Sequence, residues 1–319
     1  MKKAFIIIAV VLVVAGLAVM AGVMIAVRFD FGKFKKTNTV TNTYAPEGTF
    51  TSVDIDTDTA DILLLPSDDG KLKVVCEETE KIKHSVTVED SVLLIKVEDT
   101  RDWTDRIFFF ADSMKITVYL PAGKYESIKI REETGDVSLP SDFSFGDIDI
   151  KISTGNVDCS ASADGEIGIE TSTGNITLSG TASKSAVLKA STGHVSVKGA
   201  AVSEGLSVRV STGKTTVSDS SCGSFETDGS TGRLTMRNFT SGSFNIERGT
   251  GDVIFEDCDA GEIRVKTSTG DVTGTLRTGK NFITGTSTGS VSLPASSPDG
   301  GRCEIRTSTG DIAISVSKS

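Results

Sequence analysis

Hydrophobic and polar residues alternate along most of the chain, and the alternation itself repeats. Apolar residues recur two and four positions after the glycine of ten Thr-Gly dipeptides, with mostly Ser or Thr between them. Before the same glycines, apolar residues recur at positions −7 and −5, with many charged neighbours. A period of two is typical of half-buried strands. Each unit therefore predicts two short strands joined at a Thr-Gly corner.

The corner glycines follow one another at intervals of 19 to 21 residues. They are Gly135, Gly155, Gly174, Gly193, Gly213, Gly232, Gly251, Gly270, Gly289 and Gly310. A fixed period of this kind indicates a repeat architecture in which identical units stack. Because the inward-facing phase shifts at each corner, we expect glycine to supply a positive φ or a tight bend there.

These features predict an all-β protein with a β-solenoid of parallel stacked coils. Each coil has about 19–20 residues and turns at a Ser-Thr-Gly-x-Val corner. At a strand spacing of about 4.8 Å, ten coils form a rod roughly 48 Å long. A propeller is disfavoured because its blades need a period of about 40 residues. A β-sandwich built from hairpin repeats is the alternative fold.

The sequence divides into four regions. Residues 1–28 form a cytoplasmic stub and an N-terminal transmembrane signal-anchor helix, because residues 4–27 are uncharged and mostly apolar and a bilayer needs about 20 such residues. A cleavable signal peptide is the alternative for this segment. Residues 29–48 form a basic and aromatic juxtamembrane segment and a polar linker, residues 49–132 an irregular N-terminal β cap, and residues 133–319 the solenoid repeats.

The first two regions predict where the protein is located and how it contacts lipid. Phe29, Phe31 and Phe34 alternate with basic residues, which suits an interfacial anchor on anionic lipid. Lysine and arginine are balanced across the span, so the charge bias leaves the orientation open. We expect a single-pass protein of the cell membrane with its C-terminal domain outside the cytoplasm.

The cap region holds a cluster of aromatic residues, Trp103, Phe108, Phe109 and Phe110. They either fill the core of the cap or form an exposed partner-binding patch, because large exposed apolar patches mark interaction sites. The sequence keeps both interpretations open.

Charge restricts the class of partner. The whole chain carries −10, residues 1–27 carry +2 and residues 28–46 carry +3, so residues 47–319 carry −15. Such an acidic domain argues against nucleic acid as a ligand.

Candidate chemistry is sparse, and we predict no catalytic residues, no metal site and no cofactor. Asp252 and Asp271 follow the glycines of adjacent coils, about 5 Å apart, which is close to the spacing of a retaining glycosidase pair. A carbohydrate-active β-helix enzyme is therefore kept as an alternative. His84 and His194 lie far apart in sequence, and the five cysteines, without a C-x-x-C pair, are predicted to be reduced.

With its single apolar N-terminal span, the segment "ITVYLPAGKYESIKI" and serial "TGDV", "STGNV" and "STGDI" units, the chain resembles the bacterial putative-adhesin family of β-strand-repeat proteins, which includes LiaG-type cell-envelope proteins. The resemblance implies a β-solenoid at the cell envelope and an association with adhesion or envelope stress. It carries over no catalytic residues.

We therefore expect a membrane-anchored, extracytoplasmic module that binds or scaffolds, with cell-wall glycan or a surface protein as partner. A flat Ser/Thr-rich face would serve this role: Ser138, Asp158, Thr177, Ser196, Thr216, Thr235, Ile254, Thr273, Ser292 and Ala313. The last coil, "STGDIAISVSKS", is expected to end the rod with an apolar edge guarded by Lys318, which predicts end-to-end self-association. A cytoplasmic-facing self-assembling scaffold is the remaining alternative.

Overall fold

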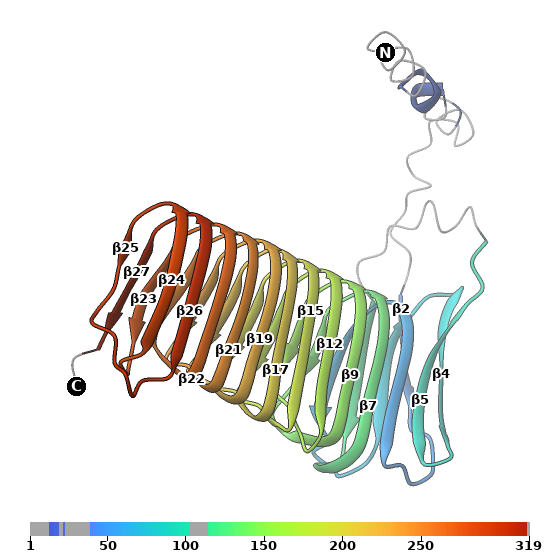
Figure 1. The fold of residues 1–319 in the computed structure, drawn as a ribbon. Coiled ribbons are helices and arrows are strands. Elements are labelled where there is room, and N and C mark those ends of the chain that lie inside the picture. Colours follow the sequence, from blue (N-terminus) through green and yellow to red (C-terminus); the bar gives the residue numbers. More distant parts are fainter. Residues whose placement is uncertain (1–12, 19–21, 23–38, 103–113, 318–319) are drawn as a thin grey trace.

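The computed structural model describes residues 13–18, 22, 39–102 and 114–317 (Figure 1). Residues 13–18 are helical, and among the described residues no helix has the length and apolar character needed to cross a membrane. Most of the predicted span, the basic and aromatic segment after it, and the aromatic residues 103 and 108–110 lie outside the described residues.

The described chain is a straight rod of stacked coils (Figure 1). Each coil crosses two sheets, which we call the pre-corner sheet and the post-corner sheet because their strands precede and follow the Thr-Gly corners. The pre-corner sheet contains β7 (Gly123–Thr134), β9 (Phe143–Thr154), β12 (Glu166–Thr173), β15 (Ser185–Thr192), β17 (Ala201–Thr212), β19 (Ser221–Thr231), β21 (Thr240–Thr250), part of β22 (Val253–Thr269), β26 (Arg302–Thr309) and β24 (Asn281–Thr288), with the short β11 (Ser162–Ala163) and β14 (Ala182–Ser183).

The post-corner sheet runs along the other side of the rod. It contains β8 (Val137–Leu139), β10 (Val157–Cys159), β13 (Ile176–Ser179), β16 (Val195–Lys198), β18 (Thr215–Ser218), β20 (Leu234–Arg237), the start of β22, β23 (Val272–Leu276), β27 (Ile312–Val316) and β25 (Val291–Ser292). Neighbouring coils pair in parallel, with equivalent residues in register, as in Val137, Val157 and Ile176. The parallel pairing confirms the β-solenoid and excludes the sandwich of hairpins.

The Thr-Gly corners are as tight as the sequence predicts. Gly232 has φ 138°, and a Cβ built on it would lie 1.8 Å from the carbonyl oxygen of Gly213 in the preceding coil. The other nine corner glycines also have positive φ. A Cβ built on each of them would likewise lie against the carbonyl oxygen of the equivalent residue in an adjacent coil. Glycine is therefore required both by the backbone angle and by the contact between coils.

The core lies between the two sheets and consists of the predicted apolar columns. Ile150, Ile169 and Leu188 face inward in one column, and Val157, Ile176 and Val195 face inward in the other. Buried polar residues interrupt the columns in places, and the Arg248 guanidinium donates to the hydroxyl groups of two of them, Thr215 and Thr227, at 3.2 and 2.9 Å. Its Nη1 fills the space where a side chain at Gly229 would lie, so Arg248 replaces missing apolar volume in the neighbouring coil.

The N-terminal end contains β1 (Val40–Tyr44), β2 (Ser52–Pro66), β3 (Lys73–Glu78), β4 (Ile82–Glu89), β5 (Val92–Asp99) and β6 (Met114–Leu120). β2 crosses both sheets: it pairs with β5 and β7 before its corner and with β6 and β8 after it. Its corner residue is Ala60, whose carbonyl oxygen faces Gly135. This extra coil does not appear in the Thr-Gly period because it lacks the Thr-Gly dipeptide. Beyond β5 and β6, the antiparallel strands β4, β3 and β1 close the end.

The C-terminal end differs from the prediction. β26 pairs with both β22 and β24, and β27 pairs with both β23 and β25, so the last coil in sequence is not the last in space. The expected open edge on the final coil is therefore wrong. The terminal coil is instead that of β24, where the half-buried Thr284 stands at the register position of the fully buried Ile305. The same coil also exposes Ile283 and Val291 by 39% and 47%, so among the described residues the apolar edge lies on the coil of β24 and β25.

Candidate functional site

The residues that follow the corner glycines form a hydrogen-bonded ladder along one edge of the rod. The side-chain oxygen of each Asp or Asn in this column accepts a hydrogen bond from the backbone N–H of the equivalent residue in the next coil. The donor–acceptor distance is 2.7 Å from Asn156 N to Asp136, 3.0 Å from Asn175 N to Asn156 and 2.9 Å from His194 N to Asn175. The frequent Asp or Asn after Thr-Gly therefore satisfies main-chain donors that the strands leave free.

This ladder accounts for the candidate acid pair. Asp252 accepts a hydrogen bond from the backbone N–H of Asp271 at 3.3 Å and forms an ion pair with Arg233 at 2.9 Å. Asp271 in turn accepts the backbone N–H of Asp311 at 2.8 Å. Both carboxylates thus accept backbone N–H groups of the next coil, and Asp252 also pairs with Arg233, so the ladder and this ion pair account for both side chains.

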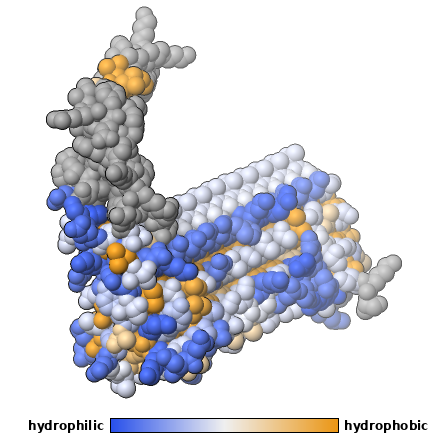
Figure 2. Space-filling view, turned by 180° about the vertical axis from the view of Figure 1, so that it is seen from behind, coloured by the Kyte–Doolittle hydropathy of each residue, from blue (hydrophilic) through white to orange (hydrophobic). Residues whose placement is uncertain are grey.

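A strip of hydroxyl groups lies beside the ladder. We call it the hydroxyl strip: Ser153, Thr154, Ser172, Thr173, Ser191, Thr192, Ser211, Thr212, Ser230, Thr231, Thr250, Ser268, Thr269, Ser308, Thr309, Ser287 and Thr288. All of these residues are exposed. Their hydroxyl groups make no hydrogen bond to the part of the chain that the structure describes. Figure 2 shows the strip as a pale, regular edge of the rod, bordered by a line of strongly hydrophilic side chains.

The outer face of the pre-corner sheet carries shallow hollows between charged side chains. One hollow of about 270 Å³ is lined by Asp149, Lys151, Glu170 and Lys189, among others. Lys189 pairs with Glu170 at 3.8 Å, and Arg131 pairs with Asp149. Because opposite charges alternate along this face, it offers no field of one sign to a ligand.

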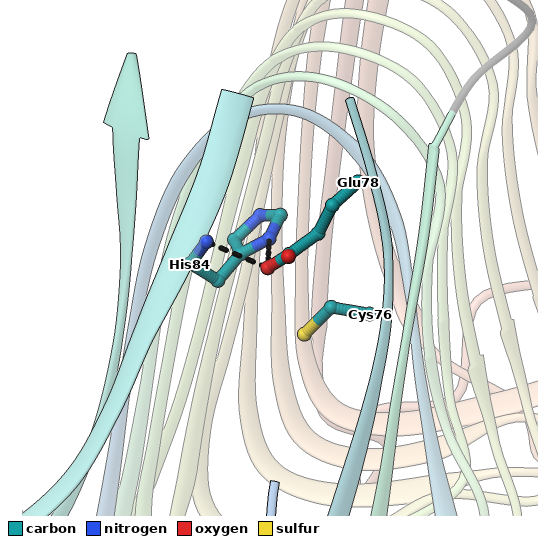
Figure 3. A group of neighbouring side chains, drawn as sticks. All are labelled: Cys76, Glu78 and His84. Atoms are coloured by element: carbon teal, nitrogen blue, oxygen red, sulfur yellow. Dashed lines mark hydrogen bonds and ion pairs between the residues drawn. The ribbon is translucent and has the colours of Figure 1, made fainter. Parts of the chain in front are cut away.

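The N-terminal end contains three potential metal ligands that the sequence analysis did not bring together. Cys76 and Glu78 lie on β3 and His84 lies on β4, and their ligand atoms all lie within 4.8 Å of one another (Figure 3). All three residues are buried. The i, i+2 spacing of Cys76 and Glu78 was the available signal, but the pairing of β3 and β4 with their neighbours was needed to place His84 beside them.

Glu78 already has a full set of hydrogen-bond donors. Its carboxylate accepts from Asn42 at 2.5 Å, from the Tyr44 hydroxyl at 2.9 Å, from the backbone N–H of His84 at 2.7 Å and from His84 Nδ1 at 3.1 Å. Burial by itself would raise the pKa of Glu78, but the hydrogen bonds from Asn42, Tyr44 and His84 outweigh it and hold that pKa below its ordinary value. The carboxylate thus joins β1, β3 and β4.

The other two members of the cluster are held in their neutral forms. Burial raises the pKa of the Cys76 thiol to about 12, and burial lowers the pKa of His84. A metal ion bound here would have to displace the Cys76 proton and the hydrogen bond between His84 and Glu78. The geometry supports a hydrogen-bonded brace at the end of the rod better than a metal centre.

The predicted aromatic cluster of Trp103, Phe108, Phe109 and Phe110 lies outside the described residues, so the partner-patch hypothesis stays a prediction. The ten corner glycines are all structural. All five cysteines are free thiols, as predicted, and Cys159 and Cys303 lie in the core.

Several solved structures are similar to this chain. A putative adhesin of Bacteroides fragilis is 15% identical, with 87% of this chain and 97% of that chain covered and a TM-score of 0.39. A putative adhesin of Parabacteroides distasonis is 12% identical, with coverage of 86% and 97% and a TM-score of 0.45. A putative lipid binding protein of the same species is 11% identical, with coverage of 88% and 97% and a TM-score of 0.29. Similarity at these scores carries no argument about function.

The comparison of sequences gives a firmer result. No curated protein matches the chain. The profile of the Toastrack DUF4097 family matches residues 50–204 and again residues 187–319, which together span nearly all of the rod. Because these two matches cover most of the chain, the chain belongs to the Toastrack DUF4097 family.

Proposed function

We propose that the protein is a membrane-anchored, extracytoplasmic, non-catalytic module that binds an extended cell-wall glycan along its rod. The observation that carries this proposal is the hydroxyl strip. It presents the same two hydroxyl groups in nearly every coil, at a repeat of about 4.8 Å. Because these hydroxyl groups are not used within the described protein, they are available to the hydroxyl and amide groups of a linear polymer.

A flat periodic surface suits a polymer better than a compact molecule. Small-molecule sites are usually enclosed and largely apolar, whereas the strip is exposed, uncharged and straight (Figure 2). A polymer lying along the rod would meet equivalent donors and acceptors at each coil, so weak contacts would add up along its length.

Binding of full-length protein to isolated wall sacculi, measured by co-sedimentation, tests the proposal. We expect the variant Ser172→Ala, Ser191→Ala and Ser211→Ala to bind several-fold more weakly than the unmodified protein. A matched control changes three serines on the outer face of the pre-corner sheet, Ser185→Ala, Ser207→Ala and Ser224→Ala. Equal binding by both variants would remove the strip from the proposal, and no sedimentation of the unmodified protein would refute glycan binding.

Two further assays test the other parts of the proposal. Protease treatment of intact cells should remove an epitope placed after Ser319, whereas its survival until lysis would favour a cytoplasmic-facing scaffold. Incubation with wall polysaccharide should release no new reducing ends. A release that depends on Asp252 or Asp271 would instead favour the carbohydrate-active enzyme.

A further inference from the structure

Three consecutive coils interrupt the Asp/Asn ladder. His194, Lys214 and Arg233 occupy the position after the corner glycine in these coils, and the coils are neighbours, because Val195 N donates to Lys214 O and Thr215 N donates to Arg233 O. None of the three side chains supplies the oxygen that Asp or Asn supplies elsewhere. Among the described residues, the backbone N–H groups of Lys214, Arg233 and Asp252 consequently have no hydrogen-bond acceptor.

The same coils concentrate positive charge on an otherwise acidic protein. Lys198 and Arg237 lie on the same outer face, with Ser218 in register between them. Arg233 pairs with Asp252 at 2.9 Å and Arg237 with Asp219 at 3.6 Å, whereas Lys198 and Lys214 make no ion pair within the described part of the chain. We call this area the basic band: His194, Lys198, Lys214, Arg233 and Arg237.

The basic band differs from the ladder on both sides of it. Towards the N-terminal end the equivalent positions hold Asn175, Asn156 and Asp136, and towards the C-terminal end they hold Asp252, Asp271 and Asp311. Ser196, Thr216 and Thr235 lie in register between the cations and add hydroxyl donors.

We propose that the basic band binds the phosphate groups of an anionic wall polymer. This inference rests on the proposed function and names the ligand class for one section of the rod. A phosphate group offers several acceptor oxygens, so it can receive hydrogen bonds from a main-chain N–H, a lysine ammonium group and an arginine guanidinium group together. Three free N–H groups in line, about 4.8 Å apart, suit a chain that runs along the rod axis.

The position of the bound anion follows from the ladder. In the coils with Asn156 and Asn175, the side-chain oxygen lies against the N–H of the next coil. A phosphate oxygen would take that place beside Lys214 and Arg233, so the ligand would complete the hydrogen bonding that the sequence leaves open. Beyond the band the polymer would leave this column, which holds Asp252 and Asp271, and lie over the neutral hydroxyl strip beside it.

The decisive variant extends the Asn ladder through the band: His194→Asn, Lys214→Asn and Arg233→Asn. It removes the Lys214 and Arg233 cations, leaves Lys198 and Arg237 in place, and supplies an acceptor for each free N–H. It keeps the fold because Asn already occupies this position at Asn156 and Asn175. A control variant removes three exposed cations from the outer face of the pre-corner sheet, Lys151→Asn, Arg264→Asn and Lys266→Asn.

Binding of full-length protein to a synthetic glycerol-phosphate oligomer, measured by calorimetry at low salt, tests the inference. We expect the band variant to bind more than about tenfold more weakly, since charged and amide donors are lost together, and the control variant to bind like the unmodified protein. An equal loss in both variants, or no binding by the unmodified protein, would overturn the inference.

A second arm separates this inference from the proposed function. Unmodified protein is sedimented with wall sacculi before and after chemical removal of their phosphate polymers. We expect weaker binding to the stripped sacculi. Equal binding to both would overturn the assignment to a phosphate polymer and leave glycan binding standing. Binding to the oligomer but to neither preparation of sacculi would refute the proposed function and leave the band as a phosphate site.

Discussion

In the central coils of the rod, segments adjacent in sequence are also adjacent in space, whereas at both ends one coil is inserted between two others. β2 lies between the coil of β5 and β6 and the coil of β7 and β8, and β26 and β27 lie between the coils of β22–β23 and β24–β25. The difference shows two ways to complete a stack. The central coils repeat one local pattern, and each end is closed by a coil of different composition.

The largest effect is expected at a central corner. Gly232→Ala places a Cβ against the Gly213 carbonyl oxygen at 1.8 Å and forces alanine to a φ of 138°. We expect a loss of more than about 3 kcal/mol in the free energy of unfolding, at the high end for a single substitution, measured by chemical denaturation. Gly168→Ala is the control, because its nearest contact would be an ordinary 3.7 Å. Similar losses for both variants would contradict the role assigned to the corner.

A smaller and local effect is expected at the C-terminal end. The buried Lys280 ammonium group donates to the Ala260 carbonyl oxygen at 2.7 Å and to Thr278 at 2.8 Å, and pairs with Asp259 at 2.7 Å. Lys280→Met removes the buried cation beside Asp259 and the donor to the Ala260 carbonyl oxygen, at a cost of about 2–3 kcal/mol. Hydrogen exchange should accelerate in β24 and β25 and stay slow in the central coils.

The control for this end is Lys266→Met, an exposed lysine on the face of the rod, for which we expect less than about 0.5 kcal/mol. If Lys280→Met destabilised all coils equally, the end would not be a separate closing unit.

The stability of the junction between β2 and β7, near the N-terminal end of the rod, should depend on pH. Glu132 is buried beside β2, where its carboxylate accepts the backbone N–H groups of Ala60 and Thr134 at 3.2 and 3.1 Å. Burial raises its pKa from 4.5 to about 8, against the lowering by these two hydrogen bonds. The protonated form is therefore the stable one in the fold, and ionisation above this pKa costs free energy.

The raised pKa of Glu132 determines whether stability rises or falls with pH. Between pH 4.5 and about 8 the folded protein holds a proton that the unfolded chain has lost, so stability falls as pH rises across this window, by up to about 1.4 kcal/mol per pH unit. Glu132→Gln should remove this slope and raise the stability at pH 8 by about 1–2 kcal/mol. Thermal melting at pH 5 and pH 8 checks it, and an unchanged slope in the variant would contradict the assignment.

The centre of the rod could be predicted from sequence because each coil repeats the same local information: a glycine corner, two apolar columns and a polar outer phase. The order of the terminal coils could not, because it depends on which coil covers a neighbour best. Thr284 in β24 gave a hint of a terminal coil, but Ala60 gave none. The brace of Cys76, Glu78 and His84 depends on antiparallel pairing at the N-terminal end, which has no repeat to reveal it.

The smallest effect, and the sharpest test of the ladder, compares a coil that has an acceptor with one that lacks it. Asn175 accepts the backbone N–H of His194 at 2.9 Å, so Asn175→Ala leaves this exposed donor to water and should cost about 0.5–1 kcal/mol. Lys214→Asn does the reverse, because it supplies an oxygen to the unpaired N–H of Arg233. It should raise stability by a similar amount. Opposite signs, measured by chemical denaturation of the two single variants, would mean that the basic band gives up stability which a bound anion can restore. If Lys214→Asn left stability unchanged, water would already satisfy the free N–H, and an anion would gain only from the positive charges of the band.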